Sequence, residues 1–143
     1  MTRIDRNDNR YMNIIADLHF HSKYSRAVSQ NMILPEIAKW AKVKGIDLIT
    51  TSDFTHTVWF REIKANLEEA GIGVYKLKSG NSSMPLRSGA AGEAIPKEIA
   101  TASGLAMTPF FILTTEISCI YTQGGKGRRI HLVVMAPSIS EAE

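Results

Sequence analysis

The sequence contains a single cysteine, Cys119, so an internal disulfide framework is excluded. One thiol without a partner fits a reducing compartment. No run of apolar residues is long enough to cross a bilayer, and residues 1–10 are rich in charge, without the apolar centre of a signal peptide. From these absences we expect a cytoplasmic protein that has no membrane partner.

A strong excess of one charge sign is also absent. The chain has 17 lysine and arginine residues against 14 aspartate and glutamate residues, a net charge of +3 and a pI of about 9.1. This mildly basic balance permits an anionic partner, such as a phosphate or a nucleic acid, without requiring one. With 143 residues, 44% of them apolar, the chain can form one domain with its own core.

The spacing of apolar residues predicts alternating strands and helices. Apolar runs predict strands at residues 13–19 and 46–52. Helical spacing predicts one helix from Pro35 to Gly45, with Trp40 on its core-facing side, and a second helix at residues 57–70. Because only a few residues link these elements, the order favours parallel strands with right-handed crossovers, which is an α/β fold.

Two histidines lie at the end of the first predicted strand, in the stretch Asp17-Leu18-His19-Phe20-His21-Ser22. Successive strand residues point to opposite faces, so His19 and His21 share one face. Two neighbouring imidazoles supply half of a metal site, because neutral histidine is a common ligand for zinc and similar ions. The alternative is a pair of polar residues at a strand end.

Further residues of the ligand type recur at later strand ends. Asp53 and His56 follow the second strand, Glu116 lies near the end of a strand predicted at residues 110–118, and His131 lies in the apolar run 130–136. The carboxyl ends of parallel strands gather functional groups at one edge of a sheet. A carboxylate in an apolar run is costly unless it is paired or binds a metal, which favours a ligand role for Glu116. The alternatives are a cap or turn for Asp53, a helix start for His56 and a core histidine for His131.

Two segments connect the later elements. Residues 77–93 lack periodicity and predict a flexible insertion, followed by a short helix with Pro96 near its start. The glycine-rich segment 123–129 lies between two apolar runs and predicts a hairpin. This segment is not a phosphate-binding P-loop, because the Lys-Ser/Thr ending and the following helix are absent.

Basic residues lie near both histidine-bearing stretches. Lys23 and Arg26 belong to a short polar loop with several serines, and Arg128 and Arg129 belong to the glycine-rich segment. Their cations, with the loop hydroxyls, are candidates for binding phosphate groups. The alternatives are a polar turn at the first place and a solvated hairpin tip at the second.

Taken together, these motifs resemble the PHP superfamily, named after polymerases and histidinol phosphatases. Within it, the chain is similar to the N-terminal part of endonuclease Q proteins over most of residues 14–138. The segments that carry this similarity are ADLHFHSKYSRA, KWAKVKGIDLITTSDFTH and FILTTEISCIYTQGGKGRRIHLVVMAPS.

The resemblance implies a distorted barrel of parallel strands with helices outside, holding two or three divalent ions, either zinc, manganese or magnesium. It implies that His19, His21 and Glu116 hold the first metals, that Glu116 can bridge two of them, and that His131 binds a second metal. It makes Asp53 and Glu116 the candidate catalytic carboxylates. It also adds Asp53 and His56 to the ligand candidates, and leaves open which of the two is the direct ligand.

The activity that the resemblance implies is phosphodiester hydrolysis in DNA repair. Endonuclease Q cuts a DNA strand on the 5′ side of a deaminated base (uracil, hypoxanthine or xanthine) or an abasic site, so DNA is the expected partner. Two alternatives remain open at this point: a phosphoesterase of the same superfamily that acts on a small phosphorylated metabolite, and a non-catalytic module that binds metal or nucleic acid.

The number of histidines indicates how much of the PHP domain is present. The superfamily completes its site with an Asp-x-His pair and a further histidine downstream, whereas this chain has four histidines in total. The last residues resemble a helix start with Ser140 as N-cap. We therefore expect residues 1–143 to be the N-terminal portion of one PHP domain, about half of its barrel. The activity of this portion alone and its oligomeric state stay open.

Overall fold

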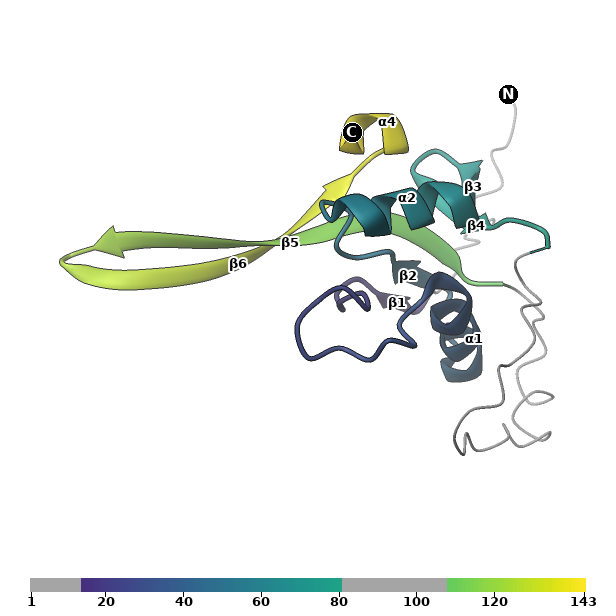
Figure 1. Ribbon diagram of the computed structural model, residues 1–143, viewed down its shortest axis with the longest axis horizontal. Helices are drawn as coiled ribbons and strands as arrows, with labels where there is room; N and C mark the ends of the chain where they lie inside the picture. The colour runs from purple at the N-terminus through teal and green to yellow at the C-terminus, as the bar shows by residue number, and fades with distance from the viewer. Residues whose placement is uncertain (1–13, 81–107) are drawn as a thin grey trace, which may run out of the picture.

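A computed structural model describes residues 14–80 and 108–143 (Figure 1). The elements in chain order are β1 (Ala16–Asp17), α1 (Leu34–Lys44), β2 (Leu48–Thr50), α2 (Thr57–Asn66), β3 (Leu67–Gly71), β4 (Val74–Leu77), β5 (Phe110–Gln123), β6 (Lys126–Ala136) and α4 (Ile139–Ala142). None of the helices in these two ranges is both long enough and apolar enough to span a bilayer.

The strands form one mixed sheet in the order β1-β2-β5-β4-β3, with β6 paired to β5. β1, β2 and β5 run parallel, whereas β4 is antiparallel to β5, and β3 is antiparallel to β4. The prediction of an α/β fold with parallel strands is thus confirmed. The strands of residues 14–80 and 108–143 make an open sheet and not a closed barrel.

The first helix has the predicted limits and one wrong side-chain assignment. Pro35 lies in its first turn, and Gly45 ends it in the left-handed conformation, with φ of 69°. Trp40, expected in the core, is 49% exposed. Ala41 is buried instead, and each residue is rotated by about 100° from its neighbour around a helix, so the two side chains face different surroundings.

The second helix is shorter than its periodicity predicts. It ends at Asn66, and the residues predicted as its last turn form β3, which pairs with β4 in a hairpin. Leu67 and Leu77 lie opposite each other in this hairpin, and both are buried in the core. An apolar residue at position 67 satisfies both the helical spacing and the strand alternation, so periodicity alone did not separate the two.

The core lies between the sheet and its helices, and Trp59 of α2 is buried at its centre. The indole Nε1 of Trp59 donates hydrogen bonds of 3.0 Å to the backbone oxygens of Thr51 and Ser52, directly after β2. Ser52 and Asp53 then adopt positive φ angles of 54° and 41°, a strained conformation for residues other than glycine. The indole therefore holds the turn that presents Asp53.

The predicted glycine-rich hairpin is confirmed. β5 and β6 pair along their whole length, and Gly124 and Gly125 take positive φ angles of 59° and 72° at the turn. The two strands leave the body of the molecule as a long ribbon (Figure 1), and the residues of β5 after Glu116 are mostly exposed. We call residues 117–132 of this ribbon the arm.

The last element differs by a few residues from its prediction. α4 begins after Ser138, whose side chain accepts a hydrogen bond of 3.1 Å from the backbone N–H of Glu141. Ser138, rather than Ser140, is thus the N-cap. The expected insertion at 77–93 is also shorter at its start, because Leu77 belongs to β4. Residues 81–93 and the short helix near Pro96 lie outside the described residues.

Candidate metal centre

Three side chains converge where the chain leaves β1 and where β5 leaves the body of the sheet. His19, His21 and Glu116 each offer one ligand atom, and these three atoms lie within 4.8 Å of one another. His19 Nε2 contacts Oε2 of Glu116, and His21 Nε2 lies 3.6 Å from the same oxygen. The rings of the two histidines lie edge to face, with centroids 5.3 Å apart. The sequence prediction brought together these same three residues.

His131 reaches the same carboxylate from the neighbouring strand. It lies opposite Ser118 in the pairing of β6 with β5, so its side chain and that of Glu116 share one face of the ribbon. Its Nδ1 contacts Oε1 of Glu116. His19 and His131 therefore contact different oxygens of one carboxylate.

The two histidine contacts keep Glu116 ionised. Hydrogen bonds from His131 and then His19 lower the pKa of its carboxyl below the ordinary value. An ionised carboxylate surrounded by imidazole nitrogens is the donor set that zinc and manganese accept in proteins. On its chemistry and its convergence, the group fits a divalent ion.

Asp53 contacts this group through His21, on the side of the ring that faces away from Glu116. Its Oδ2 accepts hydrogen bonds from the backbone N–H of Ser22 (2.7 Å) and from the hydroxyls of Ser22 (2.8 Å) and Ser25 (2.7 Å). Its Oδ1 lies 3.2 Å from Nδ1 of His21, while the other ring nitrogen of His21 faces Glu116. Partial burial opposes ionisation of Asp53, but the hydrogen bonds from Ser25 and Ser22 outweigh it and lower the pKa. Asp53 thus orients His21, as carboxylates commonly do for a metal-binding histidine.

His56 lies at the start of a helix, which was the alternative to a role as metal ligand. It is the N-cap of α2, where its Nδ1 accepts a hydrogen bond of 3.3 Å from the backbone N–H of Trp59. Its ring stacks on Tyr24 with centroids 4.5 Å apart and an angle of 16°. It does not belong to the group formed by His19, His21 and Glu116.

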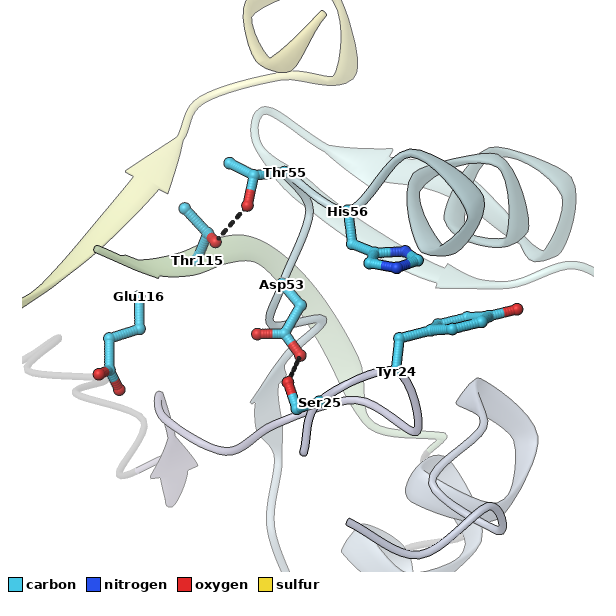
Figure 2. A pocket seen from close by; sticks show the side chains of 7 residues that line it. All are labelled: Tyr24, Ser25, Asp53, Thr55, His56, Thr115 and Glu116. Carbon is cyan, nitrogen blue, oxygen red and sulfur yellow. Dashed lines mark hydrogen bonds between the residues drawn. The ribbon is translucent and has the colours of Figure 1, made fainter. Parts of the chain in front are cut away.

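A cavity of about 300 Å³ connects these parts of the site (Figure 2). The close-up shows Glu116 and Asp53 on one side of it and the stacked rings of His56 and Tyr24 on the other. Its remaining lining residues carry hydroxyls: Ser25, Thr55 and Thr115. Every lining residue thus carries a polar group, and the cavity includes Glu116 of the candidate metal centre.

The four predicted phosphate-binding cations differ in their surroundings. Lys23 forms an ion pair of 2.9 Å with Glu62 and lies 5.0 Å from the centre of the Tyr24 ring, so its charge is already partnered. Arg26, Arg128 and Arg129 are exposed. None of these three arginines forms an ion pair within residues 14–80 and 108–143, so each could meet an anion from solvent.

Sequence reasoning missed the role of the loop serines. Ser22 and Ser25 were interpreted as hydroxyls for a phosphate, and both instead donate to Asp53. Ser22 is fully buried, so its hydroxyl does not face a phosphate in solvent. Their position directly after His21 was the available signal, since small hydroxyl residues beside a histidine pair can reach a supporting carboxylate.

We expect Asp53→Asn to loosen the site without removing a ligand. The amide offers one acceptor oxygen in place of two and no charge, so one of its two sides, toward the serines or toward His21, loses its partner. Loss of such a supporting carboxylate typically weakens metal binding about 10- to 100-fold. Zinc titration of the purified variant measures this. Asp47→Asn is the matched control, because the exposed Asp47 carboxylate accepts, among the described residues, only from the backbone N–H of Ile15. Equal zinc affinity in the two variants would remove Asp53 from the site.

Comparison with known proteins connects the fold to one class of enzyme. No protein-family model matches the chain. The structure is similar to that of a lesion-specific endonuclease from Pyrococcus furiosus, with a TM-score of 0.59 and 24% identity, covering 90% of this chain and 23% of that one. It is also similar to endonuclease Q in complex with a 27-mer duplex that has an abasic lesion at the active site. That match has a TM-score of 0.58 and 26% identity, and it covers 89% of this chain and 23% of the enzyme.

One curated sequence also matches over a short range. An uncharacterized protein of Methanocaldococcus jannaschii is 44% identical over 48 residues, which is 34% of this chain and 6% of that protein. The matched part of the chain therefore covers less than a quarter of the chain in each of the two solved structures and 6% of the curated protein. The structure is similar to the N-terminal part of endonuclease Q, an enzyme with a PHP domain, as the sequence motifs indicated.

Proposed function

We propose that this chain is the N-terminal portion of a PHP domain, part of its barrel, in a metal-dependent DNA endonuclease. Its reaction is hydrolysis of a phosphodiester on the 5′ side of a deaminated base (uracil, hypoxanthine or xanthine) or an abasic site. The observation that carries the proposal is the convergence of His19, His21 and Glu116 on one point. The similarity to endonuclease Q, one structure of which holds an abasic duplex, supports DNA as the partner.

One group of described residues, His19, His21 and Glu116, could hold a divalent ion. The proposal adds a second ion, to which His131 would contribute, and it is supported by the contact of His131 with the same carboxylate. Asp53 and His56 do not complete a third position within residues 14–80 and 108–143, because Asp53 is engaged by serines and His21, and His56 by the start of α2. When bound, such ions lower the pKa of a coordinated water and stabilise charge on phosphoryl oxygens.

The protein groups have separate tasks in this proposal. Glu116 supplies the negative charge that the two positions share. Asp53 fixes the ring of His21 through Nδ1, so that Nε2 stays directed at Glu116. Arg26, exposed in the loop after the histidines, meets a phosphate of the substrate.

The cavity favours a second candidate, a phosphoesterase for a small phosphorylated metabolite. Its volume of about 300 Å³ lies at the lower end of the range for small-molecule sites, and its polar lining suits a sugar-like group. The same metal positions would serve both reactions. The two candidates therefore differ in substrate and not in chemistry.

A nicking assay tests the proposal. The purified chain is loaded with Mn²⁺ and given matched duplexes that contain uracil, hypoxanthine, an abasic site or no lesion, and p-nitrophenyl phosphate in parallel. We expect a nick on the 5′ side of each lesion, lost with EDTA and in the His19→Ala, Glu116→Ala double variant. Turnover of p-nitrophenyl phosphate without any nicking would favour the metabolite enzyme. Bound metal with neither activity would leave a non-catalytic module.

A further inference from the structure

The two faces of the arm have different chemistry. In the pairing of β5 with β6, residues directly opposite share a face, and the faces alternate along each strand. One face carries Glu116 and His131 and continues outward with Ser118, Ile120, Thr122 and Arg129. We call this the metal-side face. The opposite face carries Ile117, Cys119, Tyr121, Arg128, Ile130 and Leu132.

This alternation separates two arginines that are neighbours in sequence. Arg129 is the next residue after His131 on the metal-side face and lies opposite Ile120. Arg128 lies opposite Tyr121 on the other face. The sequence prediction treated the two as equivalent, and the register distinguishes them.

The charge of the arm is unbalanced. Residues 117–140 contain no aspartate or glutamate, whereas Lys126, Arg128 and Arg129 all lie in this range. Arg128 and Arg129 are exposed, and neither forms an ion pair with another residue of the part of the chain that the structure describes. Both guanidinium groups are thus available to an anion. Because they lie on opposite faces of the arm, they would meet different anions.

Distance then selects the anion for Arg129. Two residues along a strand cover about 7 Å, so the backbone of Arg129 lies about 7 Å further out than that of His131. Phosphates along one strand of duplex DNA succeed each other every ~3.4 Å of helix axis. An arginine at this place can therefore reach a phosphate close to one held at Glu116 and His131.

We propose that the metal-side face of the arm guides the DNA strand away from the metal centre, with Arg129 binding a phosphate next to the one that is cleaved. Ser118 and Thr122 add hydroxyls along the same track. Arg128 lies on the opposite face of the arm and does not bind this strand. This inference rests on the proposed DNA substrate and adds to it one phosphate-binding residue and the direction in which the strand runs.

The test compares Arg129→Gln with Arg128→Gln, which make the same change of charge on opposite faces. Binding of a fluorescent abasic duplex is measured by anisotropy across a salt series, with EDTA present so that no nicking occurs. We expect Arg129→Gln to weaken binding about tenfold and to reduce the salt slope by about one. Arg128→Gln stays within about twofold of the parent chain. Arg129→Lys recovers most of the binding, because a phosphate contact needs the charge.

Hydrolysis of p-nitrophenyl phosphate separates this role from a structural one. This small substrate has no neighbouring phosphate, so Arg129→Gln leaves its turnover unchanged if Arg129 acts beside the cleaved group. Equal losses of duplex binding in the two variants, or no loss in either, would overturn the inference, as would no duplex binding by the parent chain. Nicking that persists equally in both variants would overturn the inference and leave the endonuclease standing. If Arg129→Gln binds the duplex more weakly than Arg128→Gln but the parent chain does not nick it, the inference about the arm stands and the proposed endonuclease activity is overturned.

Discussion

Replacing Glu116 with glutamine is expected to abolish metal binding at the centre. Its two oxygens contact His19 and His131, and Nε2 of His21 lies 3.6 Å from one of them, so every candidate ligand depends on this carboxylate. Glutamine keeps the shape and loses the charge. Since loss of a mere supporting group costs about 10- to 100-fold in metal affinity, loss of the shared ligand should cost at least about 100-fold.

Metal content per chain, measured after dialysis against zinc or manganese, checks this expectation. The matched control is Glu69→Gln, which removes an equal charge from an exposed position in β3. We expect the control to bind metal like the parent chain and Glu116→Gln to bind none above background. Nicking should follow the metal content. A Glu116→Gln chain with full metal occupancy would show that the ligands lie elsewhere.

The parts of the fold that could be predicted are those set by neighbours in sequence. Pro35 and Gly45 fix the limits of α1 through their own backbone preferences, and the glycines after Gln123 fix the hairpin turn. The grouping of His19, His21 and Glu116 was also predictable, but from the resemblance to the PHP superfamily. The rule that parallel strands bring their carboxyl ends to the same edge of a sheet applies to the two histidines after β1. Glu116 lies inside β5, which continues to Gln123.

The roles of Asp53 and His56 depended on contacts that no local pattern contains. Asp53 accepts from Ser22 and Ser25, which lie 31 and 28 residues away, and His56 stacks on Tyr24. Residue type marked both as ligand candidates, but which partner each one meets is decided by how the loop after β1 folds over the turn after β2. The β3–β4 hairpin was missed for a related reason, since Leu67 fits a helix as well as a strand.

Trp59→Ala should produce a large loss of stability. The side chain is completely buried, and truncating a buried aromatic residue costs about 3–5 kcal/mol. The backbone oxygens of Thr51 and Ser52 also lose the indole donor, directly before the strained turn at Asp53. We therefore expect metal affinity to fall together with the free energy of unfolding, although Trp59 is not one of the residues that would hold the metal.

Two further variants divide this effect into its parts. Trp59→Phe keeps most of the buried volume and removes the indole N–H, so it should cost about 1–3 kcal/mol, the penalty for unpaired buried polar groups. Trp40→Ala is the control, because a half-exposed side chain on α1 should cost less than about 1 kcal/mol. Urea unfolding of the metal-free chains gives all three values. Equal costs for Trp40→Ala and Trp59→Ala would contradict the placement of Trp59 at the centre of the core. A loss of metal affinity in Trp59→Phe would instead show that the two hydrogen bonds after β2, and not the bulk of the ring, hold Asp53 behind His21.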